Sequence, residues 1–161
     1  IYQDLRKKVE AVILDSYQDM YRLAYSYVRN EQDAMDIVQE SVYKCIYRAE
    51  KVKKEAYIKT WVWRVVINTA LDWKKKCTRE VAVDEIREGR YETDETPCDV
   101  INALDILGGK ERLIIILHYF EGFTLEETAG ILGMNINTMK TMLYRSLKKM
   151  KERILKGEDC L

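Results

Sequence analysis

The sequence of 161 residues contains few helix-breaking residues and few that build metal or catalytic centres. It has one proline and seven glycines, which favours helices over a turn-rich sheet protein. One histidine and four scattered cysteines, with no C-x-x-C pair, predict no metal site, no cofactor and no catalytic residue. No apolar run approaches the roughly 18 residues of a membrane span, and no secretory signal pattern occurs. We therefore expect a cytoplasmic protein with reduced thiols.

The charges are unevenly distributed, although the formal net charge is zero. Residues 80–100 carry eight acidic and two basic side chains, and they include the only proline, Pro97. This block also lacks a sustained 3.6-residue apolar repeat. We therefore predict an all-α protein with two small helical domains, residues 1–79 and 101–161, joined by an acidic flexible linker at 80–100. A solvated loop inside one domain is the alternative interpretation.

Basic side chains concentrate in two short stretches. Residues 51–79 carry nine Lys or Arg against two acids, and residues 136–156 carry seven against one. Such runs are common on solvated helix faces, but nucleic-acid-binding surfaces have the same composition. The sequence therefore contains two candidate nucleic-acid surfaces.

Residues 124–151 have the pattern of a helix-turn-helix. Thr124 and Glu127 match a capping box, Gly133 suits the left-handed position after a helix, and Asn135 can cap a second helix. Two helices joined by so short a turn are typical of this motif. A helix-turn-helix can bind DNA, and it can also serve only as a packing unit.

The second helix of this motif has two distinct faces. One face is apolar and contains Met139, Leu143, Leu147, Met150 and Ile154. The other is polar and basic, with Asn137, Thr141, Tyr144, Arg145 and Lys148 on it and Lys140 at its edge. Polar groups early in a helix can reach base edges in the major groove, and later cations can reach phosphates. An apolar helix at 110–120 should complete the core, with His118 as a core or boundary residue.

The N-terminal half predicts helices at 17–30 and 33–48, separated by a turn at Asn30. The second helix has an apolar stripe made of Ala34, Ile37, Val38, Val42 and Cys45. Its opposite face contains Asp36, Gln39, Glu40 and Tyr43. This acidic face suits docking of a basic partner, and an exposed face without a role is the alternative.

A lysine-rich loop up to Lys59 leads into a third predicted helix, from Trp61 to Lys76. This helix is apolar on most sides, so it should be largely buried, with a polar stripe at Arg64, Asn68 and Asp72. Its tryptophans are expected in the core, although aromatic rings beside lysines can also stack on unpaired bases.

Three of these stretches, taken together, resemble one protein family. They are "DAMDIVQE" at 33–40, "WVWRVVINTALDWKKK" at 61–76 and "TLEETAGILGMNINTMKTMLYRSLKKM" at 124–150. In this order and spacing, the chain resembles a bacterial RNA polymerase sigma factor of the extracytoplasmic-function type, group 4 of the sigma-70 family. The likeness spans about residues 15–76 and 100–155. It implies a non-enzymatic subunit that binds core RNA polymerase and directs promoter-specific transcription initiation.

The resemblance implies three sets of contacts. The set that docks on the polymerase is Asp36, Gln39 and Glu40. The set that recognises and opens the minus-ten promoter element is Arg64, Asn68, Lys74, Lys75 and Lys76. The set that reads the minus-thirty-five element is Asn137, Thr138, Lys140, Thr141, Tyr144, Arg145 and Lys148. The family also implies that the second domain grips the polymerase flap.

The resemblance further implies an anti-sigma factor, often membrane-anchored, and no small-molecule substrate. The chain departs from the family pattern at Met142, where arginine is common, at Lys74–Lys76, which replaces arginines, and at Gly108-Gly109, which replaces a proline turn. The alternative function is a stand-alone helix-turn-helix regulator with an N-terminal sensing or dimerising domain. An enzyme is disfavoured because no catalytic set is grouped in the sequence.

Overall fold

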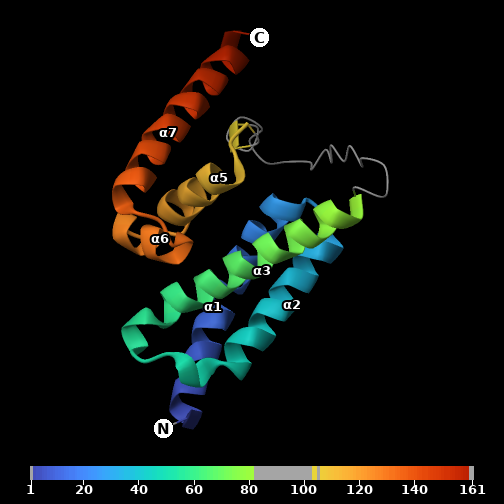
Figure 1. Cartoon of the computed structure of the whole chain (residues 1–161), viewed down its shortest axis with the longest axis vertical. Coiled ribbons are helices and arrows are strands. Elements are labelled where there is room, and N and C mark those ends of the chain that lie inside the picture. The colour runs from blue at the N-terminus through green and yellow to red at the C-terminus, as the bar shows by residue number, and fades with distance from the viewer. Residues whose placement is uncertain (1, 82–102, 105, 160–161) are drawn as a thin grey trace. The chain divides into compact units, whose positions relative to one another are not determined.

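The computed structural model describes residues 2–81, 103–104 and 106–159, and the chain divides into two compact units, Ile1–Arg90 and Tyr91–Leu161. Every regular element in the described ranges is a helix, and no strand occurs there, which confirms the all-α prediction (Figure 1). The predicted acidic linker, 80–100, lies outside the described residues except for its first two residues, which belong to a helix.

The first unit contains three long helices, α1 (Tyr2–Val28), α2 (Glu31–Tyr47) and α3 (Ile58–Val81). Each of them packs against the other two (Figure 1). Two 3-10 turns, η1 (Ala49–Lys51) and η2 (Glu55–Tyr57), connect α2 to α3. The largest fully buried side chains come from all three helices and include Met20, Leu23, Ile37, Val38, Trp63 and Ile67.

The junction between α1 and α2 is a tight reversal at the predicted turn. Arg29 has φ 55°, a left-handed conformation that is uncommon for a residue with a side chain. Asn30 follows as the N-cap, and its Oδ1 accepts a hydrogen bond of 3.1 Å from the backbone N–H of Asp33. These two residues end α1 and start α2 in a new direction.

The observed helices differ from the predicted ones at their starts. Helix α1 begins at Tyr2 rather than near residue 17, because Val9 and Ile13 are buried and extend its apolar stripe by two turns. Helix α3 begins at Ile58, which is buried, so the predicted loop is shorter than expected. Trp63 is the fully buried tryptophan, whereas Trp61 and Trp73 are half-buried.

Cys45 lies in the core of the first unit. Burial raises the pKa of its thiol to about 12, since the charged thiolate would lose its hydration there. The neutral thiol therefore packs as a small apolar group. The described residues contain no group of three or more His, Cys, Asp or Glu side chains placed to hold a metal ion.

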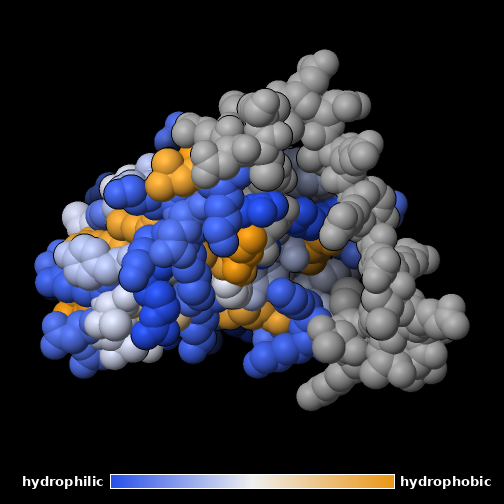
Figure 2. Space-filling view, turned by 90° about the horizontal axis from the view of Figure 1, so that it is seen from above, coloured by the Kyte–Doolittle hydropathy of each residue, from blue (hydrophilic) through white to orange (hydrophobic). Residues whose placement is uncertain are grey.

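Hydrophilic residues cover most of the described surface in the view of Figure 2, and hydrophobic residues form small separate patches. None of the helices in the described ranges has both the length and the hydrophobicity required to cross a lipid bilayer.

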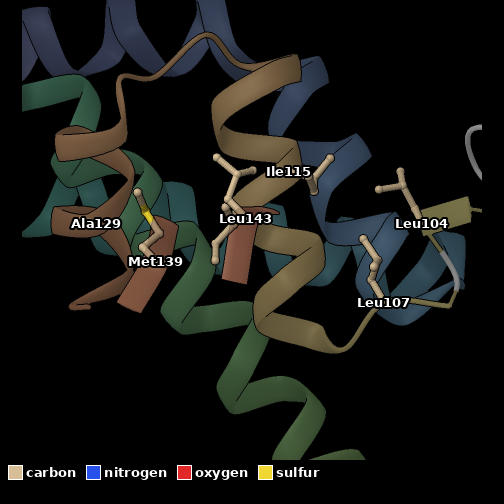
Figure 3. Close-up of a cluster of buried hydrophobic side chains, with 7 residues drawn as sticks. Leu104, Leu107, Ile115, Ala129, Met139 and Leu143 are labelled. Atoms are coloured by element: carbon tan, nitrogen blue, oxygen red, sulfur yellow. The ribbon is translucent and has the colours of Figure 1, made fainter. Parts of the chain in front are cut away.

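The second unit contains α5 (Gly109–Ile115), one π-helical turn η3 (Ile116–Phe120), α6 (Leu125–Leu132) and α7 (Ile136–Asp159). Its core brings together Leu104, Leu107, Ile114, Ile115, Ala129, Met139 and Leu143 (Figure 3). The predicted apolar face of α7 is confirmed, because Met139 and Leu143 are buried and Leu147 and Met150 pack against them. His118 is half-buried as expected, with Nδ1 2.8 Å from the Phe123 carbonyl oxygen.

The turn between α6 and α7 has the predicted cap geometry. Thr124 and Glu127 form both hydrogen bonds of a capping box at the start of α6. Gly133 ends α6 with φ 64°, a left-handed conformation that favours glycine. Asn135 then accepts a 2.8 Å hydrogen bond from the backbone N–H of Asn137 at the start of α7. The helix-turn-helix is therefore confirmed.

A partly buried ion pair holds the middle of α7. The Nζ of Lys149 lies 3.2 and 3.3 Å from the two carboxylate oxygens of Glu111 on α5. The next residue, Arg112, donates hydrogen bonds to the carbonyls of Leu104 and Leu107, at 3.2 and 3.3 Å. Glu111 therefore holds α7 against α5, and Arg112 holds the segment before α5 against the same helix, α5.

Truncation of Met139 should destabilise only the second unit. Met139→Ala removes a fully buried side chain, so we expect it to lower the free energy of unfolding of that unit by about 2–5 kcal/mol. All three tryptophans lie in the first unit, so their fluorescence reports that unit alone, while far-ultraviolet circular dichroism reports both. In urea, the dichroism transition should shift and the fluorescence transition should not. Leu155→Ala, at an exposed site on α7, is the matched control.

Candidate protein and nucleic-acid interfaces

The acidic face of α2 is formed by the side of the helix that the core leaves uncovered. Gln39 and Glu40 are exposed and Asp36 is half-exposed. Ala34, Ile37, Val38 and Cys45 are buried on the other side. The structure therefore brings the three predicted docking residues together on one solvent face of a rigid helix, where they can meet a partner without rearrangement of the backbone.

Lys44 connects this acidic face to α3. Its Nζ lies 3.0 Å from Glu40 Oε1 and donates a 3.2 Å hydrogen bond to Thr69 Oγ1. The Thr69 hydroxyl in turn donates to the Val65 carbonyl at 2.7 Å. Lys44 therefore connects Glu40 to α3, and it partly balances the charge of Glu40 inside the protein.

The segment between α2 and α3 presents lysines around an exposed aromatic ring. Glu55, one of its two acids, pairs with Lys8 of α1 at 2.8 Å, and this hydrogen bond raises the pKa of Lys8. Lys51 and Lys53 are exposed. The Nζ of Lys54 lies 5.9 Å from the ring centroid of Tyr57, which is 59% exposed. Cations beside an accessible ring are the usual elements of a surface that binds single-stranded nucleic acid.

The five predicted minus-ten residues do not form one uniform surface. Arg64, Asn68, Lys75 and Lys76 are exposed along α3. Lys74 is exposed as well, but its Nζ also lies 4.5 Å from the ring centroid of Tyr27 on α1, a cation–π contact. Lys74 therefore binds α3 to α1 in addition to any contact with DNA.

The polar face of α7 is open along its first four turns. Asn137, Thr138, Thr141, Arg145 and Lys148 are exposed, Tyr144 is 66% exposed, and Lys140 is half-buried. The Thr141 hydroxyl donates to the Asn137 carbonyl at 3.1 Å. The structure thus places six of the seven predicted residues on the exposed face opposite the buried Met139 and Leu143, with Lys140 at the edge of that face. They lie at the start of a helix that has the dimensions to enter a major groove.

Comparison with known proteins gives one consistent result. The family Sigma-70 region 2 matches residues 12–80, and the family Sigma-70, region 4 matches residues 99–150. The RNA polymerase sigma factor SigV of Bacillus subtilis is 42% identical over 151 residues, 91% of this chain and 90% of its own. The ECF RNA polymerase sigma factor SigX of the same organism is 23% identical, over 89% and 82% of the two chains.

The chain belongs to the extracytoplasmic-function group of sigma-70 RNA polymerase sigma factors. The sigma factor RpoE of Bartonella quintana, solved with the anti-sigma factor NepR, has the same fold, with a TM-score of 0.77. RpoE is 24% identical and matches 91% of this sigma factor and 96% of its own chain. Membership of this family replaces the alternative of a stand-alone regulator, because it accounts for the first unit as well as the helix-turn-helix.

The structure of the sigma factor also exposes residues that sequence reasoning did not select. Tyr47 and Tyr57 are large aromatic residues with more than half of their surface accessible, and Tyr119 and Phe120 are exposed on the π-helical turn. Tyr47 follows Glu40 by seven residues, a spacing that returns to the same helix face, so the pattern contained this signal. Tyr57 lies before the start of α3, so helical spacing in the sequence could not indicate its exposure.

Lys74 and Lys75 should behave differently although they are adjacent. Lys74→Ala removes the cation–π contact with Tyr27, so we expect the free energy of unfolding of the first unit to fall by about 0.5–1 kcal/mol. Lys75→Ala, the matched control, should leave it unchanged. Urea unfolding followed by tryptophan fluorescence measures both. Equal effects of the two substitutions would show that the contact with Tyr27 does not stabilise the fold.

Proposed function

We propose that this sigma factor docks on core RNA polymerase through the α2 face that contains Asp36, Gln39 and Glu40. The observation that supports this assignment is the grouping of two carboxylates and an amide on the helix face opposite the buried Ala34, Ile37 and Val38. A negative surface of this kind favours a positively charged partner and guides the encounter with it. The Glu40–Lys44 pair keeps one of the carboxylates in place before binding.

The minus-ten element is proposed to bind along α3 and the segment before it. Arg64 and Asn68 offer hydrogen-bond donors to bases, and Lys75 and Lys76 offer charge to the backbone. The exposed ring of Tyr57 is proposed to stack on an unpaired base, a role for which the half-buried Trp61 and Trp73 are less accessible. Lys74 is proposed to contribute mainly through α1.

The minus-thirty-five element is proposed to bind the polar face of α7. The residues in its first two turns would meet base edges, namely Asn137, Thr138, Lys140 and Thr141. One and two turns further on lie Tyr144, Arg145 and Lys148. The ion pair of Lys149 with Glu111 removes that lysine from the DNA-facing set and fixes the helix instead.

We also propose that the protein acts in the cytoplasm, as a binding subunit rather than an enzyme, and that an anti-sigma factor regulates it. RpoE with NepR and CnrH with the cytosolic domain of CnrY are solved complexes of similar chains, the former titled as a complex with an anti-sigma factor. A membrane anchor on such a partner is an expectation from the family.

Reconstituted transcription tests the function as a whole. The protein is mixed with sigma-free core polymerase and genomic DNA from its source, and the transcript starts are mapped. We expect discrete starts that share two spaced upstream motifs and are absent without the protein. The absence of both such starts and co-elution with core would contradict the proposal.

Charge reversal on the α2 face should weaken binding to core polymerase. We expect Asp36→Lys and Glu40→Lys each to raise the Kd by about tenfold or more, because each opposes a positive partner surface. Asp15→Lys makes the same charge change at an exposed site on α1 and is the matched control. Fluorescence anisotropy with labelled protein measures the affinity, and tryptophan fluorescence verifies the fold. Parent-like affinity of both variants would exclude this docking face.

Arg145 should contribute to recognition of the upstream element. Arg145→Ala is expected to cost about 1–3 kcal/mol of binding to the cognate element if its guanidinium contacts a base. The assay compares holoenzyme binding to cognate and scrambled upstream sequences. Lys156→Ala, on the same side of α7 three turns later, controls for lost charge. An equal loss on both sequences would instead make Arg145 a phosphate contact.

A further inference from the structure

Two stacked tyrosines stand on the outside of α2 without cover from the described part of the chain. Tyr43 is 67% exposed and Tyr47 is 70% exposed. Their ring centroids lie 5.9 Å apart with an interplanar angle of 11°, one helical turn from each other. Two accessible rings in contact form a continuous apolar surface, and surfaces of this kind commonly mark binding sites.

The two rings continue the acidic docking face. Asp36, Glu40, Tyr43 and Tyr47 follow one another at spacings of four, three and four residues, which place them in a single stripe along the helix. The stripe is therefore charged toward the start of α2 and aromatic toward its end. A partner helix lying along Asp36 and Glu40 would reach the tyrosines within two further turns.

A pocket opens beside the rings, between the end of α2 and the start of α1. Its volume is about 550 Å³, and Tyr43, Ile46 and Tyr47 line it together with the buried Ala49. Gln3 and Arg6 of α1 and Glu50 form the polar part of its lining. Arg6 is also paired with Glu10 at 3.4 Å. Apolar walls with a few polar groups suit a side chain that has an aliphatic stem and a polar end.

We propose that Tyr43, Tyr47 and this pocket form the second half of the polymerase-docking surface and receive aliphatic and basic side chains of the polymerase segment that meets Asp36 and Glu40. The inference rests on the proposed docking role of the α2 face. Continuity along one helix selects the polymerase as occupant, because a partner that lies along α2 from its acidic end extends over the rings. Aromatic side chains supply most of the affinity in many interfaces, whereas charges at the rim mainly guide encounter and set the register.

The experiment measures the affinity of the full-length chain for core polymerase by fluorescence anisotropy. Tyr43→Ala and Tyr47→Ala should each raise the Kd by about tenfold or more, while Tyr43→Phe and Tyr47→Phe, which keep both rings, should raise it much less. Leu14→Ala removes a highly exposed apolar side chain from α1 and is the matched control. Tryptophan fluorescence and urea unfolding verify that each variant is folded.

The salt dependence of the affinity distinguishes the acidic half of the docking surface from its aromatic half. The effect of Glu40→Lys should shrink as ionic strength rises, because exposed charges are screened. The effect of Tyr47→Ala should persist, because burial of an aromatic ring does not depend on charge. A tyrosine effect that fades with salt in parallel with that of Glu40→Lys would overturn the proposed apolar contact.

The outcomes also separate this inference from the proposed function. If Glu40→Lys weakens binding and both tyrosine-to-alanine variants bind like the parent, the inference is wrong and the docking assignment stands. If none of these variants weakens binding, the docking face itself is wrong. If the tyrosine variants only convert a self-associated form to monomer, measured by sedimentation equilibrium, the rings bind a second copy of the chain and the inference is overturned.

Discussion

The burial of one apolar stripe on each helix is the constraint on which the surfaces of this protein depend. Side chains of an α-helix recur on one face every three to four residues, so a stripe that packs inward leaves the opposite face in water. In α2, burial of Ala34, Ile37 and Val38 turns Asp36 and Glu40 outward. In α7, burial of Met139 and Leu143 has the same effect on Tyr144 and Arg145.

Positive charge in this sigma factor serves both structure and binding. Lys8 pairs with Glu55, Lys44 with Glu40 and Thr69, and Lys149 with Glu111. Lys74 lies over an aromatic ring of a neighbouring helix. A count of basic residues along the sequence therefore overstates the charge available to DNA. Other cations remain exposed without such a contact in the described structure, among them Lys51 and Lys53 before α3, Lys75 on α3 and Lys148 on α7.

Lys44 links the helices that carry the two proposed binding surfaces of the first unit, α2 and α3. Lys44 contacts Glu40 on the proposed docking face and Thr69 on the helix that carries Asn68. A polymerase segment that competes for Glu40 would act on the same lysine that touches α3. This arrangement places a short polar path between the proposed polymerase contact and the proposed promoter contact, within one rigid set of three helices.

Sequence alone was enough to predict the all-α fold, the helix-turn-helix and the family. These features depend on local periodicity and caps, as at Thr124, Gly133 and Asn135, and on motifs in a recognisable order. The start of α1 was missed because Val9 and Ile13 form a sparse stripe among charged residues. The choice of Trp63 as the buried tryptophan was missed because α3 is apolar on most sides, so periodicity does not indicate its inner face.

Only the tertiary structure decided which members of each predicted set also contact other helices of the chain. Lys74 and Lys75 are adjacent residues of the same type, but the Tyr27 ring of α1 lies beside Lys74 and not beside Lys75. The stacked Tyr43 and Tyr47 gain their significance from the pocket beside them, which requires α1 to lie next to the end of α2. Local sequence encodes the face on which a side chain lies, whereas its neighbours come from segments far away in the chain, whose approach depends on packing of the whole unit.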